Sequence, residues 1–174
     1  MAWRLEKAGA HVIYGLVGLK THSKCTLVIR REKDGIRRYV HVATGNYNAS
    51  TAKLYTDLGI LTCSDRFGID ASAFFNLLSG YSDPPIWDSF IVAPINLRQR
   101  CIELIDREIH FAKNGEDAHM IAKMKSLLDK GIIENVYEAS QAGVIIELIV
   151  RGICVLIPGI PGVSDNITVR SIVG

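Results

Sequence analysis

A short polar stretch, Lys20-Thr21-His22-Ser23-Lys24, separates the apolar runs Val12–Leu19 and Cys25–Ile29. The two runs predict strands, and side chains two residues apart on a strand point to the same face. On such a strand the imidazole of His22 would lie beside the ammonium of Lys24. The imidazole could then attack a phosphoryl group while the ammonium stabilises the phosphoryl oxygens. The same spacing also occurs in ordinary strands with a hydrogen-bonded histidine and a solvated lysine, so the pattern alone leaves both interpretations open.

Composition limits the class of protein. Of the 174 residues 48% are hydrophobic, which is enough to bury the core of one domain or of two small ones. A formal charge of +2 is too small to indicate a nucleic-acid-binding protein. We expect no secretory signal, and no run reaches the ~18 apolar residues of a membrane helix. Four separated cysteines without a C-x-x-C pair indicate reduced thiols and no zinc site, as in a soluble cytoplasmic protein.

Strand and helix signals alternate along the chain, which predicts an α/β architecture. Strands are predicted at residues 11–17, 23–31, 37–43, 118–124, 144–150 and 167–173, and helices at residues 1–8, 50–55, 70–79, 97–114 and 129–139. The Asp34-Gly35 pair predicts a hairpin turn between the second and third strands. The clearest helix is 97–114, because its isoleucines repeat at helical spacing.

Two parts of the chain are expected to be separate domains. Ser82-Asp83-Pro84-Pro85 is the best linker candidate, because paired prolines resist both helix and central strand. This linker divides the sequence into residues 1–85 and 86–174. A weak internal repeat agrees with two related parts, since a predicted helix, an Ala-Gly pair and a strand follow one another near Gly9 and again near Gly143.

Five sequence blocks together carry a resemblance to a known family. They are Tyr14–Lys24, Tyr39–Asn48, Thr51–Asp57, Phe90–Pro94 and Glu147–Cys154. In their order and at about their spacing, these blocks resemble bacterial polyphosphate kinases of the long, ATP-linked type. The resemblance extends from Val12 almost to the end of the chain.

This resemblance implies a fold for each part. Family members carry a pair of phospholipase D-like domains. Residues 1–85 are therefore expected to be the C-terminal part of the first such domain, and residues 86–174 the N-terminal part of the second. Each partial domain is expected to have a mixed β-sheet flanked by helices.

The resemblance also assigns candidate site residues. His22 falls on the family's phosphorylated histidine, Tyr55 on a tyrosine that binds the nucleotide, and Arg151 on an arginine that contacts ATP. From the residues themselves, Lys24 can neutralise phosphoryl charge, and an arginine fork suits phosphate. Asn46, in the turn after the strand at 37–43, could offer its amide to a phosphate oxygen. Tyr55 as a core residue and Lys24 as a solvated one are the alternatives.

The substrates and partners implied by the resemblance are ATP and ADP together with inorganic polyphosphate. Mg²⁺ is expected to act through residues outside this chain, and no metal ligand is predicted within it. Full-length family members are expected to be homo-oligomers in the cytoplasm, with peripheral association with the inner membrane left open. A second catalytic histidine is expected beyond Gly174 and magnesium-associated arginines before Met1, so the isolated chain is expected to be inactive.

Two other functions stay open on the residues alone. The first is a phospholipase D-like phosphodiesterase, which would use the same histidine and lysine. Relatives of that kind place an aspartate a few residues after the lysine, where this chain has Ile29, Arg30 and Arg31. The second is a non-catalytic, phosphate-binding fragment.

Overall fold

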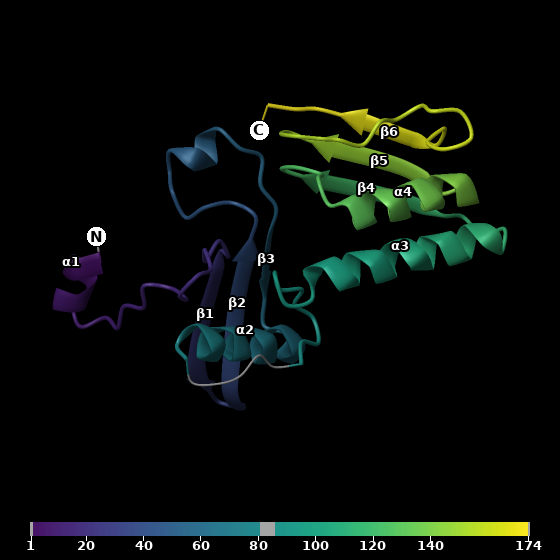
Figure 1. The fold of residues 1–174 in the computed structure, drawn as a ribbon. Coiled ribbons are helices and arrows are strands. Elements are labelled where there is room, and N and C mark those ends of the chain that lie inside the picture. The colour runs from purple at the N-terminus through teal and green to yellow at the C-terminus, as the bar shows by residue number, and fades with distance from the viewer. Residues whose placement is uncertain (1, 81–85, 174) are drawn as a thin grey trace. The chain divides into compact units, whose positions relative to one another are not determined.

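The computed structural model describes residues 2–80 and 86–173, and the chain divides into two units, Met1–Phe90 and Ile91–Gly174. Each unit has a three-stranded sheet of its own (Figure 1). The predicted linker Ser82–Pro85 lies outside the described residues.

The sheet of unit 1 is an antiparallel meander. β1 (Cys25–Glu32) and β2 (Gly35–Ala43) form the predicted hairpin, with Cys25 opposite Val42. β3 (Gly59–Thr62) then pairs with the end of β2, with Gly59 opposite Ala43. The remaining elements of unit 1 are α1 (Ala2–Lys7), the short 3-10 helix η1 (Thr51–Lys53) and α2 (Asp65–Leu78).

α2 packs on one face of this sheet, against β1 and β2. Val40 of β2 and Ala71 of α2 are fully buried. Gly68 allows the close approach, because a Cβ added there would lie 2.8 Å from Arg38 Cβ. Side chains alternate along a strand, so the face that carries Arg38 and Val40 is covered by α2, and the opposite face carries Thr26 and His41.

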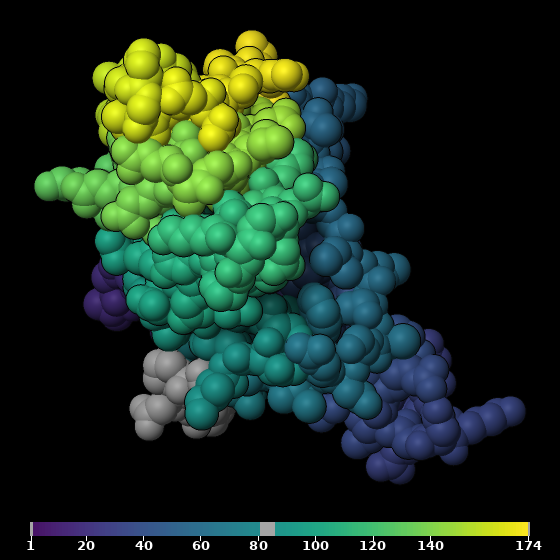
Figure 2. Space-filling view, turned by 90° about the vertical axis from the view of Figure 1, so that its right-hand side faces the viewer, coloured from purple at the N-terminus to yellow at the C-terminus, as the bar shows by residue number. Residues whose placement is uncertain are grey.

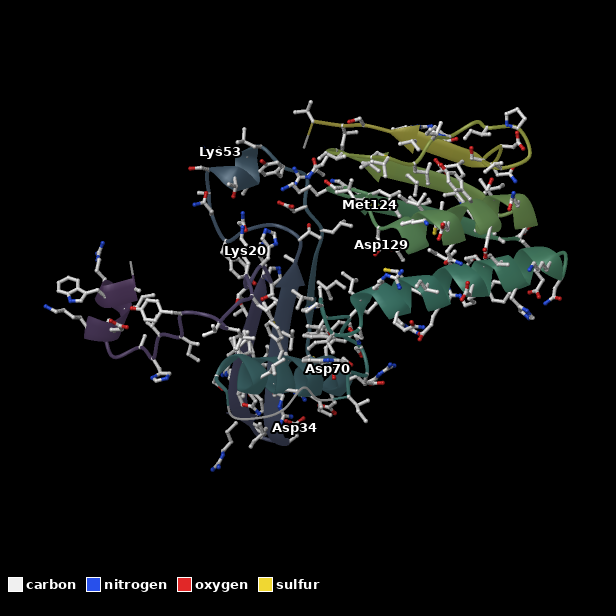
Figure 3. The ribbon with its side chains drawn as sticks, in the orientation of Figure 1. Lys20, Asp34, Lys53, Asp70, Met124 and Asp129 are labelled. Atoms are coloured by element: carbon white, nitrogen blue, oxygen red, sulfur yellow. The ribbon has the colours of Figure 1, made fainter. Side chains whose placement is uncertain are left out.

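A buried carboxylate fixes the segment that follows α2. Asp70 is only 2% exposed and accepts hydrogen bonds from the backbone N–H groups of Asp88, Ser89 and Phe90, the shortest at 2.6 Å (Figure 3). The Trp87 and Phe90 rings stack beside it. The interaction satisfies both the buried charge and three backbone donors, which explains why an acidic residue is tolerated in this core.

Unit 2 alternates helices and strands around a parallel sheet. Its elements are α3 (Leu97–Lys113), β4 (His119–Met124), α4 (Lys130–Ala142), β5 (Ile145–Val150) and β6 (Ile167–Arg170). The sheet order is β4-β5-β6, and both pairings are parallel. Its core combines one sheet face with the two helices, and Ile146, Leu148 and Val150 of β5 are buried there. In the space-filling view the yellow end of the chain packs on the green segment before it (Figure 2).

The expected α/β class is confirmed, and one detail of it differs. Neither sheet mixes strand directions among the described residues. In unit 1 a tight turn and a loop return the chain alongside itself, which gives antiparallel pairs. In unit 2 a helix and a longer crossover connect the strands, which gives parallel pairs.

Two predicted elements need correction, and one strand was missed. Residues 11–17 form no strand, because Gly15 has a φ of +94° that interrupts extended backbone. β3 was not predicted, because four residues are too few to show a period. α2 begins at Asp65 rather than at residue 70, since its first turn lacks apolar periodicity. Among the described helices, none has the length and apolar character needed to cross a membrane.

Candidate active site

His22 and Lys24 lie side by side at the surface of unit 1, immediately before β1 rather than on it. Lys24 Nζ is 2.9 Å from His22 Nδ1 and donates to the His22 carbonyl oxygen at 2.6 Å. The Lys24 carbonyl accepts from Ala43 N at 3.0 Å, which extends the β1–β2 ladder by one bond. The pair is therefore fixed to the first strand by its backbone, while the His22 side chain stays exposed.

The Lys24 ammonium lies close to both ring nitrogens of His22, 2.9 Å from Nδ1 and 3.3 Å from Nε2. An imidazole acts as a nucleophile in its neutral form. The flexible four-carbon stem of Lys24 allows its ammonium to move from the ring to the oxygens of an incoming phosphoryl group.

A loop between β2 and β3 carries two further candidates, Asn46 and Tyr55, and its two ends are bonded together. Thr44 N donates to Leu58 O at 3.0 Å, and Leu58 N donates to Thr44 Oγ1 at 3.0 Å. The Thr44 hydroxyl also donates to Asp57 Oδ1 at 3.1 Å. These three bonds close the loop at its base.

Gly45 completes this closure. A Cβ added at Gly45 would lie 2.3 Å from Asp57 Oδ2, a distance that no side chain tolerates. The glycine therefore lets the Asp57 carboxylate pack directly against the backbone. Between the closed ends, Asn48 Oδ1 accepts from the N–H groups of Ser50 and Thr51, which starts η1, the helix that carries Lys53 (Figure 3).

A second set of side chains connects the same loop to the sheet. The Tyr47 hydroxyl accepts from Thr26 Oγ1 at 3.0 Å and lies 2.8 Å from His41 Nδ1. Thr26 and His41 are directly opposite each other on β1 and β2. His41 is thus a hydrogen-bonded structural histidine. The Thr44–Asp57 and Thr26–Tyr47 bonds were not predicted, because the partners are 13 and 21 residues apart in the sequence.

Arg151 belongs to unit 2 and follows the carboxyl end of β5. The strand predicted at 144–150 ends at Val150 in the structure too, and Arg151 is exposed. Its N–H donates to Met124 O at 3.2 Å, so the backbone keeps the register of the sheet for one more residue. Ligands of open α/β sheets bind at the carboxyl ends of strands, which fits a phosphate contact here.

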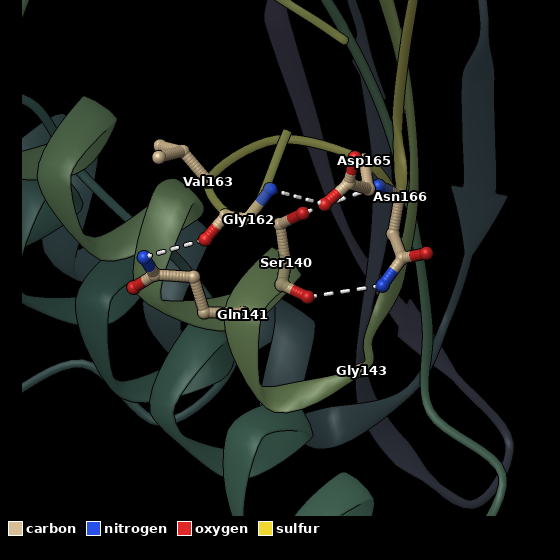
Figure 4. A pocket seen from close by; sticks show the side chains of 7 residues that line it. All are labelled: Ser140, Gln141, Gly143, Gly162, Val163, Asp165 and Asn166. Atoms are coloured by element: carbon tan, nitrogen blue, oxygen red, sulfur yellow. Dashed lines mark hydrogen bonds between the residues drawn. The ribbon is translucent and has the colours of Figure 1, made fainter. Parts of the chain in front are cut away.

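A pocket of about 410 Å³ lies at the opposite end of the same sheet (Figure 4). It is lined by Ser140, Gln141, Gly143, Gly162, Val163, Asp165 and Asn166, which precede β5 and β6. Its polar groups bond to one another: Asn166 Nδ2 donates to Ser140 O, and Gln141 Nε2 donates to Gly162 O. These bonds hold the loop before β6 against α4. We therefore interpret the pocket as a packing feature of the fold and not as a ligand site.

No group of three or more His, Cys, Asp or Glu side chains gathers anywhere in residues 2–80 and 86–173 in a way that could hold a metal ion. The described residues therefore offer no cluster of this kind to a Mg²⁺ ion.

Models of one family match the chain along almost its whole length. The model of polyphosphate kinase C-terminal domain 1 matches residues 1–84, and that of C-terminal domain 2 matches residues 90–174. The chain belongs to the polyphosphate kinase family. The family expected from the sequence blocks is thereby confirmed.

Individual relatives agree with this membership. The polyphosphate kinase of Halalkalibacterium halodurans is 61% identical over 172 residues, and that of Thermosynechococcus vestitus 54% over 173. Each alignment covers 99% of this chain and 24% of the relative, so the chain spans about a quarter of their length. The fold is also similar to the crystal structure of the polyphosphate kinase of Porphyromonas gingivalis, with a TM-score of 0.87 and a sequence identity of 36%. The superposition covers 99% of this chain and 29% of that one.

Proposed function

We propose that this chain supplies the phosphohistidine part of a kinase that transfers the terminal phosphoryl group of ATP to inorganic polyphosphate. The observation that carries the proposal is the 2.9 Å contact between His22 Nδ1 and Lys24 Nζ at the start of β1. It places a nucleophile and a permanent positive charge at one exposed point. Membership of the polyphosphate kinase family supports the choice of substrates.

In the proposed reaction, a lone pair of the His22 imidazole attacks the γ-phosphorus of ATP. An N–P bond forms, the bond from the γ-phosphorus to the bridging oxygen breaks, and ADP leaves with that electron pair. A terminal oxygen of polyphosphate then attacks the phosphohistidine, the N–P bond breaks, and the imidazole is restored. Each step is reversible, and catalysis depends mainly on positioning and on neutralising the oxygens.

The other candidates have binding roles in this proposal. Lys24 neutralises charge on the transferred group. Asn46 donates to a phosphate oxygen from the loop closed by Thr44 and Asp57. Tyr55, on the same loop, contacts the nucleotide, and Arg151 binds phosphate through its planar fork. Mg²⁺, the oligomeric state and membrane association stay predictions.

Labelling with [γ-³²P]ATP tests the assignment in a protein of the relatives' full length that contains this chain. We expect label that is labile in acid and stable in alkali, as a phosphohistidine is. His22→Ala should abolish it, whereas His110→Ala should keep it, because His110 is an exposed histidine on α3 whose Nε2 lies 2.9 Å from Asn114 Nδ2. Undiminished label in His22→Ala would show that the nucleophile is another residue.

A phosphodiesterase is the weaker alternative. The positions where phospholipase D relatives carry an aspartate are filled by Ile29, Arg30 and Arg31, which lie on β1 and are exposed. Hydrolysis of a model phosphodiester without ATP would favour this alternative over the kinase.

A further inference from the structure

Three side chains on the outer face of the unit 1 sheet are joined by hydrogen bonds and have no part in the proposed reaction so far. The Thr26 hydroxyl donates to the Tyr47 oxygen at 3.0 Å, and that oxygen lies 2.8 Å from His41 Nδ1. Thr26 is directly opposite His41 on the neighbouring strand. The rings of Tyr47 and His41 have their centroids 5.6 Å apart. We call these three residues the Thr26–Tyr47–His41 relay.

The direction of the bonds in this relay assigns the proton of the His41 ring. A tyrosine hydroxyl has one proton, and the Tyr47 oxygen already accepts from Thr26. His41 Nδ1 is the acceptor within reach of the Tyr47 proton. If Nδ1 carried the ring proton instead, the Tyr47 proton would have no acceptor among the described residues. The neutral ring of His41 therefore carries its proton on Nε2.

The Nε2 atom of His41 leans toward the end of the sheet where His22 and Lys24 lie. A Cβ added at Gly59 would lie 3.0 Å from His41 Nε2 and 3.6 Å from the Cβ of Ala43. Gly59 is opposite Ala43, and Ala43 N donates to the Lys24 carbonyl oxygen. The His41 ring thus reaches from its own position on β2 over the neighbouring row of residues, which contains Lys24.

Small residues separate the His41 Nε2–H group from Lys24. The order across this row is Lys24, Ala43 and Gly59, so at most a methyl group stands on the backbone between them. With about 4.8 Å between neighbouring strands, the Lys24 and Gly59 Cα atoms are roughly 10 Å apart. Lys24 is two residues from Thr26, which is opposite His41, so all of these side chains are on one face. His41 Nε2 has no hydrogen-bond partner among the described residues.

We propose that Tyr47 is a positioning residue for phosphoryl transfer, an inference that rests on the proposed kinase function. Its bond to Nδ1 holds His41 in the tautomer whose Nε2–H donates to an oxygen of the phosphoryl group bound between His41 and Lys24. This donor stabilises the charge on that oxygen while His22 attacks the phosphorus. The His41 proton stays on Nε2, and no bond beyond those of the proposed reaction forms or breaks. The structural bond at one ring nitrogen thus directs the other nitrogen to the substrate.

The tautomer can be measured by ¹⁵N NMR of the 174-residue chain at about pH 8, where an ordinary histidine is neutral. We expect one tautomer of His41, with the proton on Nε2, and a mixture of tautomers in Tyr47→Phe. Tyr39→Phe is the matched control and should leave the tautomer unchanged, because Tyr39 lies on the same strand but donates to Glu32. A ring proton on Nδ1 in the unchanged chain would overturn the proposal.

The rate of His22 labelling by [γ-³²P]ATP, in a full-length protein that contains this chain, measures the effect on the reaction. Tyr47→Phe should lower the rate at saturating ATP roughly tenfold and change the KM for ATP by less than about twofold. Gly59→Ala should also slow labelling, because its methyl group would lie 3.0 Å from His41 Nε2 and keep the phosphoryl group away. Thr26→Ser keeps a hydroxyl donor, so it should keep the rate, as should Tyr39→Phe.

The outcomes separate this inference from the proposed function. A raised KM with an unchanged rate in Tyr47→Phe would show that Tyr47 only holds the loop of Asn46 and Tyr55, and would overturn the inference. An unchanged rate in Gly59→Ala would overturn it too. In both cases a labelled His22 would keep the proposed function. Absence of label on His22 in the unchanged protein would reject the proposed function and this inference together.

Discussion

At the scale of single residues, the closed base of the loop after β2 positions two candidate phosphate- and nucleotide-binding residues, Asn46 and Tyr55. Gly45→Ala should push the Asp57 carboxylate out of place, because the new Cβ would lie 2.3 Å from Asp57 Oδ2. We expect ATP binding, measured by titration calorimetry, to weaken roughly tenfold while the fold is kept.

A double-mutant cycle separates this clash from a general loss of stability. In an Asp57→Gly background both the carboxylate and the Asp57 Cβ, which would lie 2.9 Å from the new Cβ, are absent. Gly45→Ala should therefore cost much less there than in the unchanged chain. Thr44→Ser, which keeps the hydroxyl, should bind ATP normally. Additive effects of the Gly45 and Asp57 changes would contradict the proposed closure.

Side-chain contacts in the candidate site can be predicted from the sequence only where the two residues are close together in the chain. The contact of His22 with Lys24 could be predicted, because a separation of two residues limits where the side chains point. The bonds of Thr44 with Asp57 and of Thr26 with Tyr47 could not, since 13 and 21 residues separate the partners and only the folded sheet brings them together.

At the scale of elements, the start of α4 depends on one exposed carboxylate. Asp129 accepts from Ile132 N at 2.9 Å as the N-cap, and Arg98 Nε donates to it at 3.0 Å (Figure 3). The hydrogen bond from Arg98, followed by the one from Ile132 N, lowers the pKa of Asp129 below its ordinary value of 3.8. A lowered pKa means that this stabilisation is present above pH 3.8 and is lost as the pH falls through the folded value.

Thermal unfolding of two variants measures this contribution. Asp129→Ala loses the cap and the ion pair, and should lower the melting temperature of unit 2 by roughly 4–8 °C near neutral pH. Asp129→Asn keeps a capping oxygen and should lose less. The difference between the unchanged chain and Asp129→Asn should shrink in strong acid, and a difference independent of pH would contradict the role of the charge.

The sequence identifies most elements through local signals. α3, β4 and β5 have clear periods or long apolar runs, and their predicted bounds agree with the structure to within a few residues. β3 has only four residues and exists because it pairs with β2, a non-local contact that no window of sequence contains. Residues 11–17 are apolar but include Gly15, whose positive φ the pattern does not reveal.

At the scale of the whole chain, the two units have separate cores. The principal core cluster lies wholly in unit 2, whereas Val40, Ala71 and Phe74 are the buried apolar residues of unit 1. We therefore expect residues 91–174 expressed alone to fold and to unfold cooperatively. Ile146→Ala, a change at a fully buried position, should cost that fragment about 2–5 kcal/mol.

A second substitution tests the independence of the units. Phe74→Ala in the 174-residue chain should destabilise unit 1 by about 3–5 kcal/mol and leave the unit 2 transition unchanged in denaturant melts followed by NMR. A fragment 91–174 that stays unfolded, or one shared transition that both substitutions shift equally, would contradict two separate cores.

Transfer through His22 is the central claim for the whole molecule, and a chase experiment tests it most directly. A full-length protein that contains this chain is first labelled with [γ-³²P]ATP, freed of nucleotide, and then mixed with unlabelled polyphosphate or, separately, with ADP. The account predicts that the label leaves the protein and appears in polyphosphate in the first case and in ATP in the second. Label that stays on the protein, or that is released only as inorganic phosphate, would contradict it.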